Sequence, residues 1–327
     1  MRKITSIAAI GAALSWQPVA AMAAEKKAEV QYTSLPAAST WHLDYSEESC
    51  NLMRTFGTGD DALTMKMEWT NPGTDGFDIQ ITGGHRLLPK PGAKITYRFL
   101  PNGQEIVSDR FFYGSGMIDG KQAVTIGLGG ANFNGESPPL ADDKNKSGGK
   151  RPASKDGGNG STGEVAPASV DAENAKTGVR VQAMAFALTN YGAYRLELGS
   201  MEKPMRAVRE CLDDLLAGWG LDAAVMASLR SPPTPRGNPG KWLVPDDYPS
   251  DALRNEQSAV VAFRLMIDSE GKVSDCIVAN INHDEGFAKF TCGLLSQRAR
   301  FNAAIDANGN PTPSYFISRA IWAVPLW

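Results

Sequence analysis

Apolar and polar residues alternate with a period of two in several short segments of the first half of the chain. The alternation is unbroken from Leu63 to Trp69, which is the pattern of a β-strand with one buried face. Gly, Pro and Asn residues that favour turns separate this segment from its neighbours. Strands of this length and spacing predict a small antiparallel sandwich or barrel. Further strands are predicted at 77–81, 94–99, 105–112 and 122–126.

Residues 135–178 interrupt this pattern and contain almost no large apolar side chains. Such a segment cannot bury enough surface to offset the entropy lost on ordering, so we expect it to be disordered. It either joins two domains or interrupts one. The two strands and the helix predicted over 179–218 are too few to form a domain of their own. We therefore favour one β-rich domain over residues 41–230, with 135–178 as an insertion and the helix closing the domain.

The last part of the chain has a different pattern. Residues 231–241 are rich in proline, and we interpret them as a linker with extended backbone. Residues 242–327 follow the order helix, strand, strand, helix, strand. A small antiparallel sheet with this order must bury its apolar face under the helices. The predicted fold class is α+β, a β-rich domain with a closing helix followed by a small sheet packed by two helices.

Short motifs occur in a defined order along this second domain. Tyr248-Pro249 stands at its entrance, Val261 and Phe263 lie in the first strand, and Asp268-x-x-Gly271-x-Val273 crosses the hairpin. Arg300-Phe301 closes the second helix, and Gly309 precedes the last strand. In this order the motifs resemble the C-terminal domain of the TonB energy-transducer family over residues 242–325.

The resemblance implies a periplasmic domain that binds a short partner peptide by β-strand addition to the exposed edge of its last strand. The partner would be an envelope protein or a peptide of an outer-membrane receptor, and a second copy could pair at the same edge to form a homodimer. We expect the side chains of Tyr315, Ile317 and Ile321 to pack in the core and Arg319 to face outward. Trp322 and Trp327 add aromatic surface at the chain end, which either anchors a peptide or tucks back onto the sheet. The candidate edge residues are Tyr315, Ile317, Ser318, Arg319, Ala320 and Ile321.

The N-terminal residues 1–23 have the three parts of a secretory signal peptide. Arg2 and Lys3 precede a short apolar run, and Ala21-Met22-Ala23 fits the small-x-small pattern that signal peptidase reads. We expect cleavage between Ala23 and Ala24, a flexible leader over 24–40, and a periplasmic location. The alternative is an uncleaved inner-membrane anchor, as in a genuine TonB-type energy transducer for receptor-dependent transport. A transducer of that family also has a long Pro-rich spacer, where this chain has a β-rich domain.

The composition of the chain argues against some classes of partner and of binding site. The formal net charge of -3, without a basic stripe, argues against nucleic acid. The 3 histidines are widely scattered, so we expect no metal site and no cofactor. Four cysteines in an exported protein predict disulfides. Cys276 lies on the predicted hairpin and Cys292 in the helix that must pack over it. We therefore pair these two, which leaves Cys50 to pair with Cys211.

Three motifs resemble catalytic signatures, and each has a simpler interpretation. The glycine-rich segment 127–132 lacks the third glycine of a dinucleotide loop and no βαβ unit follows it. Ser115 lies in a segment that lacks the first glycine of a nucleophile elbow. The paired acids 213–214 diverge around a helix, and we interpret them and 246–247 as solvated surface. We expect no enzyme, with a hydrolase in the first domain as the remaining alternative. The leading hypothesis is a periplasmic TonB-C-like interaction module.

Overall fold

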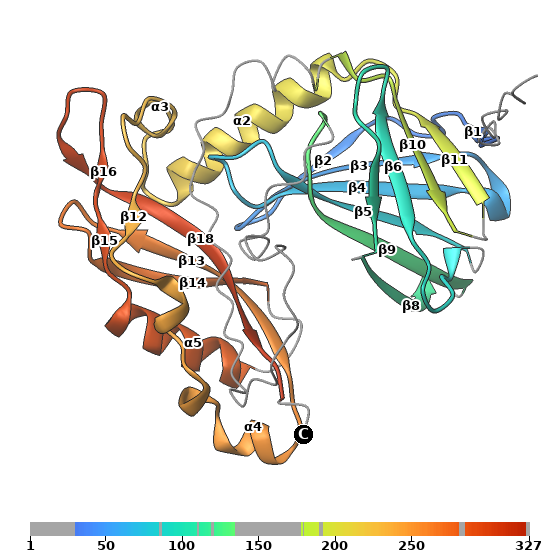
Figure 1. Ribbon diagram of the computed structural model, residues 1–327. Coiled ribbons are helices and arrows are strands. Elements are labelled where there is room, and N and C mark those ends of the chain that lie inside the picture. The colour runs from blue at the N-terminus through green and yellow to red at the C-terminus, as the bar shows by residue number, and fades with distance from the viewer. Residues whose placement is uncertain are drawn as a thin grey trace, which may run out of the picture. The chain divides into compact units, whose positions relative to one another are not determined.

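Two β-sheets packed face to face form the first part of the protein. The computed structural model describes residues 30–324, except 85–86, 110, 119–120, 135–177, 179, 190–191 and 281–284. The sheets are open rather than closed into a barrel, and their inner faces share one hydrophobic core (Figure 1). The five-stranded sheet has the order β1 (Thr33–Leu35), β11 (Gly192–Glu197), β10 (Ala183–Leu188), β6 (Ile95–Leu100) and β7 (Ile106–Ser108). The six-stranded sheet has the order β2 (His42–Tyr45), β3 (Cys50–Phe56), β4 (Leu63–Trp69), β5 (Phe77–Gly83), β9 (Lys121–Ala131) and β8 (Phe112–Ile118).

Strand β10 lies in the middle of the five-stranded sheet, although it follows residues 135–178 in the chain. It pairs with β6 on one side and with β11 on the other. The long helix α2 (Glu202–Gly218) then packs on β3 and buries Met205, Val208 and Leu215. The segment after the predicted insertion therefore supplies the central strand and the closing helix of the sandwich.

One strand prediction was wrong. The alternation at 105–112 predicted a single strand, but the chain forms β7 and β8 there, in different sheets. It leaves the five-stranded sheet after Ser108 and enters the six-stranded sheet at Phe112.

The second part of the protein is a three-stranded antiparallel sheet with the order β14 (Val273–Asn280), β13 (Ala259–Ile267) and β18 (Ser314–Trp322). Helix α5 (Glu285–Arg298) packs against β14 and β13, and its inner side buries Phe287, Thr291 and Leu295. A tight turn joins β13 to β14. Gly271 has a φ of +80°, and a Cβ there would lie 2.0 Å from the Phe301 carbonyl oxygen, so only glycine fits.

Short elements complete the fold. The 3-10 helix η1 (Gly59–Asp61) lies between β3 and β4 of the sandwich. The elements after α2 are the helices α3 (Ala223–Ala227), η3 (Pro239–Lys241), η4 (Pro245–Asp247) and α4 (Ser250–Arg254) and the strands β12 (Thr234–Pro235), β15 (Phe301–Asn302), β16 (Ala304–Ile305) and β17 (Pro311–Thr312). The Pro-rich segment is extended where it pairs with other strands, at Ser231 and over β12, but its end forms the 3-10 helix η3 and is not extended. Strand β12 pairs with β15, and the Arg236 amide donates to the Arg300 carbonyl at 2.7 Å. The domain boundary at 231–241 stays a prediction.

Two disulfides link the elements. Cys50 on β3 bonds to Cys211 on α2, with 6.1 Å between their Cα atoms. Cys276 on β14 bonds to Cys292 on α5, with 5.5 Å between their Cα atoms. These are the two pairs that the predicted topology suggested. Each attaches a helix to the sheet that it covers.

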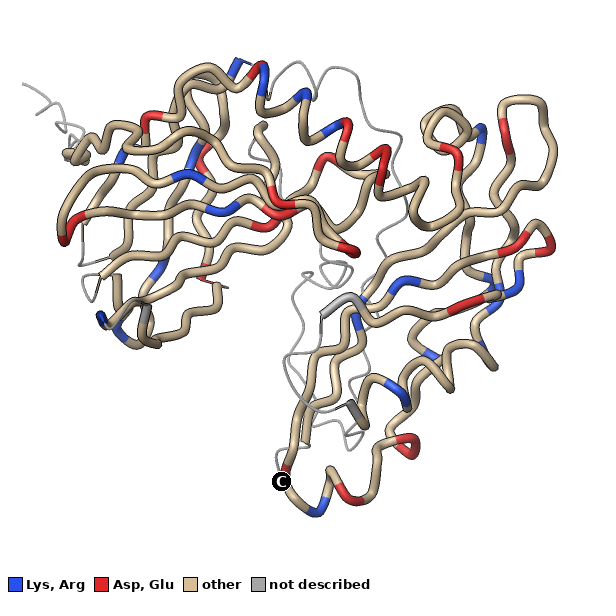
Figure 2. Tube along the Cα trace, turned by 180° about the vertical axis from the view of Figure 1, so that it is seen from behind, with Lys and Arg blue, Asp and Glu red and all other residues tan. Residues whose placement is uncertain are grey.

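Several predictions fall outside the described residues, namely the signal peptide with its cleavage site at Ala23 and Ala24, the insertion except Gly178, and Trp327. Of the flexible leader predicted over 24–40, residues 33–35 form β1 and pair with β11. Within the described part of the chain, no helix has the length and apolar character needed to cross a membrane. Acidic and basic side chains are interspersed along α2, as Figure 2 shows.

Candidate functional site: the edge strand β18

Strand β18 lies at one edge of the three-stranded sheet. It pairs with β13 along its whole length, from Ser314 opposite Ile267 to Trp322 opposite Ala259. Among the described residues it has no second strand partner. The other edge of the sheet is β14, which α5 covers and to which Cys276–Cys292 attaches it. The backbone amides and carbonyls on the outer side of β18 are therefore a candidate site for an added strand.

One face of β18 packs into the core under α5. Phe316, Ala320 and Trp322 belong to this core, and the Trp322 indole nitrogen donates to the Thr291 hydroxyl at 2.9 Å. Ser318 is also buried on this face. Of the two alternatives for Trp322, the structure shows that it packs back onto the sheet, because only 5% of it is exposed. The aromatic rings of Tyr248, Phe287 and Phe290 surround it.

The other face of β18 carries Tyr315, Ile317, Arg319 and Ile321. We predicted that the three apolar residues pack in the core and that Arg319 alternates with them, but all four share one face. Tyr315 is buried, Ile317 is half-buried, and Arg319 and Ile321 are exposed. The first half of this face is covered by Leu216, Leu221 and Trp219, which follow from the end of α2. The second half of the face, at Arg319 and Ile321, is open.

A polar cluster accompanies the covered half of the face. Arg264 on β13 forms an ion pair with Glu48, and its guanidinium carbon lies 3.8 Å from the centroid of the Trp219 ring. Burial lowers the pKa of Arg264, and Glu48 opposes this shift. The Tyr315 hydroxyl bonds to the Asn71 side-chain oxygen at 3.1 Å, and burial raises the pKa of Tyr315 well above its usual range. These contacts join the TonB-C-like sheet to α2 and to two turns of the sandwich.

The sequence analysis did not predict this cluster, although the sequence of β13 indicates that Arg264 is buried. Arg264 lies between Ala262 and Met266 on the face of β13 opposite Val261, Phe263 and Leu265. A strand with small or apolar residues on both faces is covered on both sides. A single arginine on the second face then requires an anionic partner, which Glu48 supplies.

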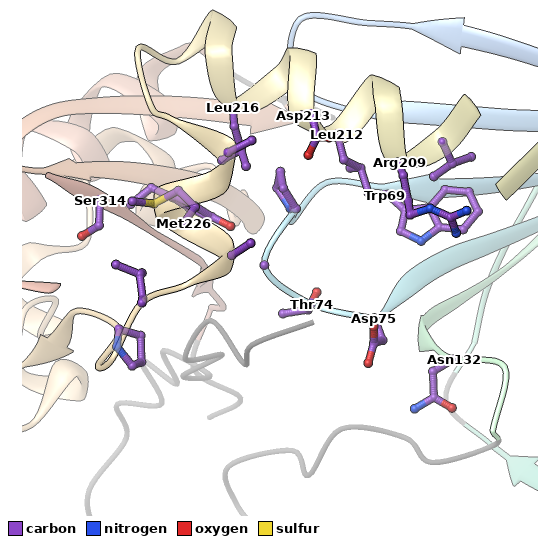
Figure 3. Close-up of a pocket in the computed structure, with 18 of the residues that line it drawn as sticks. Trp69, Thr74, Asp75, Asn132, Arg209, Leu212, Asp213, Leu216, Met226 and Ser314 are labelled. Carbon is purple, nitrogen blue, oxygen red and sulfur yellow. The ribbon is translucent and has the colours of Figure 1, made fainter. Parts of the chain in front are cut away.

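A cavity of about 420 Å³ lies beside the start of β18 (Figure 3). Its wall combines the end of β4 at Trp69, the turn at 72–75, helices α2 and α3, and Ser314. Arg209 and Asp213 project from α2 at the cavity, and the lining is otherwise largely apolar. The Ser314 hydroxyl is buried without a hydrogen-bond partner among the described residues. The cavity has the size of a small-molecule site.

The motifs that resembled catalytic signatures lie in unrelated places. The glycine-rich segment at 127–132 mostly belongs to β9, and Ser115 lies on β8. Asp213 and Asp214 are exposed on α2. Within the described residues, no cluster of His, Cys, Asp and Glu could hold a metal ion.

The interpretation of residues 246–247 as solvated surface was wrong for Asp247. Its side chain accepts hydrogen bonds from Arg298, one of them at 2.9 Å, and from the Val244 amide at 2.8 Å. The hydrogen bond from Arg298 lowers the pKa of Asp247. The pair fastens η4 to the end of α5, which is a structural role.

Comparison with known proteins agrees with the resemblance in the motifs. Residues 244–321 match the family model described as Gram-negative bacterial TonB protein C-terminal. No curated protein and no solved structure matches the chain. The matched segment contains the sheet β14–β13–β18 and α5, and it ends one residue before the end of β18. Residues 244–321 thus form a TonB C-terminal domain, a domain of the Gram-negative cell envelope.

Proposed function

We propose that the protein acts in the periplasm as an interaction module without chemistry of its own, and that an extended segment of an envelope partner adds as a fourth strand beside β18. The observation that carries this proposal is the outer side of β18, which has no strand partner among the described residues. Unpaired backbone groups there bind water until a partner strand replaces it. Backbone pairing would supply affinity, and alternate side chains would supply specificity.

The two halves of β18 offer different surroundings to such a strand. Near Tyr315, the face opposite α5 is already occupied by Trp219, Leu216 and Leu221. Near Arg319 and Ile321 this face is exposed. A partner strand would therefore place its selective side chains against Arg319 and Ile321. A partner residue that is acidic or apolar would suit these two positions.

Strand addition is tested by photocrosslinking in the producing cells. A benzophenone amino acid replaces Ile321 on β18, and the matched control carries it at Ser274 on the opposite edge, β14. Both positions are exposed or nearly so. We expect a defined cross-linked partner from position 321 and none from 274. Equal capture from both edges would contradict the proposal.

Two single proline variants then test whether the partner binds through backbone hydrogen bonds to β18. Successive amides point to opposite sides of a strand, so one of Arg319 and Ala320 donates to β13 and the other faces the open edge. Proline at the edge position leaves the sheet folded, whereas proline at the other position destabilises it. The variant that keeps the wild-type unfolding midpoint should lose crosslinking at 321 by at least about tenfold, because a partner strand loses a backbone donor. Undiminished capture by this folded variant would exclude β18 as the binding edge.

A further inference from the structure

The edge strand β8 of the sandwich contains no charged residue, whereas the edge strand β18 contains Arg319. Among the described residues its only strand partner is β9. Every residue from Phe112 to Met117 is exposed, including 55% of Phe112, 54% of Tyr113 and 68% of Met117. The strand contains no charged residue and no proline. Edge strands usually carry such residues to prevent pairing with other chains, so an edge without them is suited to a partner strand.

The sheet holds the aromatic residues of β8 in place. Phe112 pairs with Gly127 on β9, and its ring lies where a side chain at 127 would be, since a Cβ there would fall 1.7 Å from the ring. The ring of Tyr113 packs near that of Phe111, with 6.5 Å between their centroids. The exposed apolar surface is therefore an ordered one, and ordering costs less on binding.

The sequence of β8 is self-complementary about Ser115. Gly114 and Gly116 flank this serine, Tyr113 and Met117 come next, and apolar Phe112 and Ile118 end the strand. In an antiparallel pair of two β8 strands centred on Ser115, Tyr113 of each copy faces Met117 of the other, since opposite residues share a face. Sulfur–aromatic contacts of this kind are favourable. Gly114 and Gly116 face each other across the pair, so no side chain crowds either face of the sheet beside Ser115.

We propose that β8 is a homodimer contact, in which two copies of this chain pair their β8 strands antiparallel about a two-fold axis at Ser115 and join their six-stranded sheets. The occupant is a second copy because the size pattern of β8 is symmetric about Ser115, so that in the isologous pair glycine faces glycine and Tyr113 faces Met117. A single strand pair buries less surface than the ~1,200–2,000 Å² of a stable interface. The dimer is therefore reversible and forms as the concentration rises.

Cysteine crosslinking tests the register in the full-length exported protein. In Ser115→Cys the two new thiols lie opposite each other at the axis. Met117→Cys is the matched control on the same strand and face, because its thiol faces Tyr113 and lies four residues, roughly 13 Å, from its symmetry mate. Under mild oxidation we expect a disulfide-linked dimer from Ser115→Cys, at least tenfold more than from Met117→Cys. Equal dimer formation by both variants, or none by either, overturns the proposal.

A charge exchange tests the pairing without any new thiol. Tyr113→Lys with Met117→Lys places lysine opposite lysine at two points, whereas Tyr113→Lys with Met117→Glu places lysine opposite glutamate at both. Sedimentation over a concentration series should give at least tenfold weaker dimerisation for the first variant and recovery in the second at low salt. Wild-type protein that stays monomeric, or dimerisation equal in both variants, overturns the proposal. A crosslinker at Tyr113 that captures a different protein instead of a second copy would assign β8 to another partner.

Discussion

The guanidinium carbon of Arg264 lies 3.8 Å from the centroid of the Trp219 ring. Arg264 belongs to β13 of the TonB C-terminal domain, and Trp219 follows α2 of the sandwich. Only 5% of Arg264 is exposed, so its charge depends on Glu48 and on the ring face of Trp219. A cation desolvated over an indole ring contributes about 2 kcal/mol. The second face of the TonB-C sheet is therefore stabilised by residues of the sandwich.

We expect Glu48→Gln to lower the free energy of unfolding by about 3 kcal/mol, because it leaves the buried charge of Arg264 without its partner. Urea unfolding measures the loss. Glu47→Gln is the control, since Glu47 is exposed beside Glu48 and should change the stability by less than about 0.5 kcal/mol. Equal losses in both variants would show that the ion pair does not stabilise the fold.

The Cys50–Cys211 disulfide should hold the sandwich together after a cut within 135–178. We predict that limited proteolysis cleaves first near Lys150-Arg151 or Lys155, and that the two pieces run as one species without reductant. The bridge closes a loop over a sequence separation of 161 residues, which corresponds to about 5 kcal/mol in the chain-entropy model. Cys50→Ser with Cys211→Ser should release the pieces once the noncovalent contacts are denatured. A segment that resists protease would contradict the expectation of disorder.

The Asp247–Arg298 pair predicts a stability difference that depends on pH. The pKa of Asp247 is lowered by its hydrogen bond from Arg298. A lowered carboxyl pKa contributes stability above the unfolded value of about 3.9, and this contribution is lost as the pH falls through the folded pKa. Asp247→Asn should therefore be less stable than wild type at pH 7, and the difference should shrink below about pH 4. The exposed neighbour gives the control, Asp246→Asn, which should show no such convergence in unfolding measured across pH.

The ring of Phe112 and the absent side chain of Gly127 should be energetically coupled. Gly127→Ala forces the ring away from its place on β9 and should cost about 1–3 kcal/mol. In a Phe112→Ala background the same substitution should cost less than about 1 kcal/mol, since the obstructing ring is gone. Thermal unfolding of the four proteins completes the cycle. Equal costs in both backgrounds would mean that the ring does not rest on Gly127.

The leader should be removed between Ala23 and Ala24. The basic start, the short apolar run and the small residues at 21–23 motivate this prediction. N-terminal sequencing of the protein from the periplasmic fraction measures it, and the expected mature chain begins Ala24-Glu25-Lys26. A chain that still begins with Met1 and fractionates with the inner membrane would favour the energy-transducer alternative.

Strict alternation predicted β4 with its true bounds, because one face of that strand is buried and the other is half-buried. The pattern of apolar residues over 242–327 predicted the order of its helices and strands, and that order brought Cys276 and Cys292 together. The residue pattern could not predict which side chains of β18 point into the core under α5. Its two faces are both partly covered, by α5 and by the end of α2, so apolar residues occur at consecutive positions and a period of two does not identify the inner face.

Contacts between residues far apart in the chain also could not be predicted from the sequence. Glu48 and Arg264 are 216 residues apart, and neither residue carries a local pattern that names the other. The division of 105–112 between two sheets is likewise set by where β6 and β9 lie. Periodicity reports how each segment is buried, and it does not report which sheet buries it.

The order of strands in the sheets also determines which part of the protein can complete its fold first. Strand β1 pairs with β11, and β10 is the central strand between β11 and β6, so the five-stranded sheet is incomplete until the chain has reached residue 197. The TonB C-terminal domain forms its sheet from strands within 259–322. Contacts between distant segments slow folding, so the part made last is positioned to acquire its structure soonest after synthesis. During that interval β1 and β6 lack their partners β11 and β10, and a chaperone that binds nascent strands would act there.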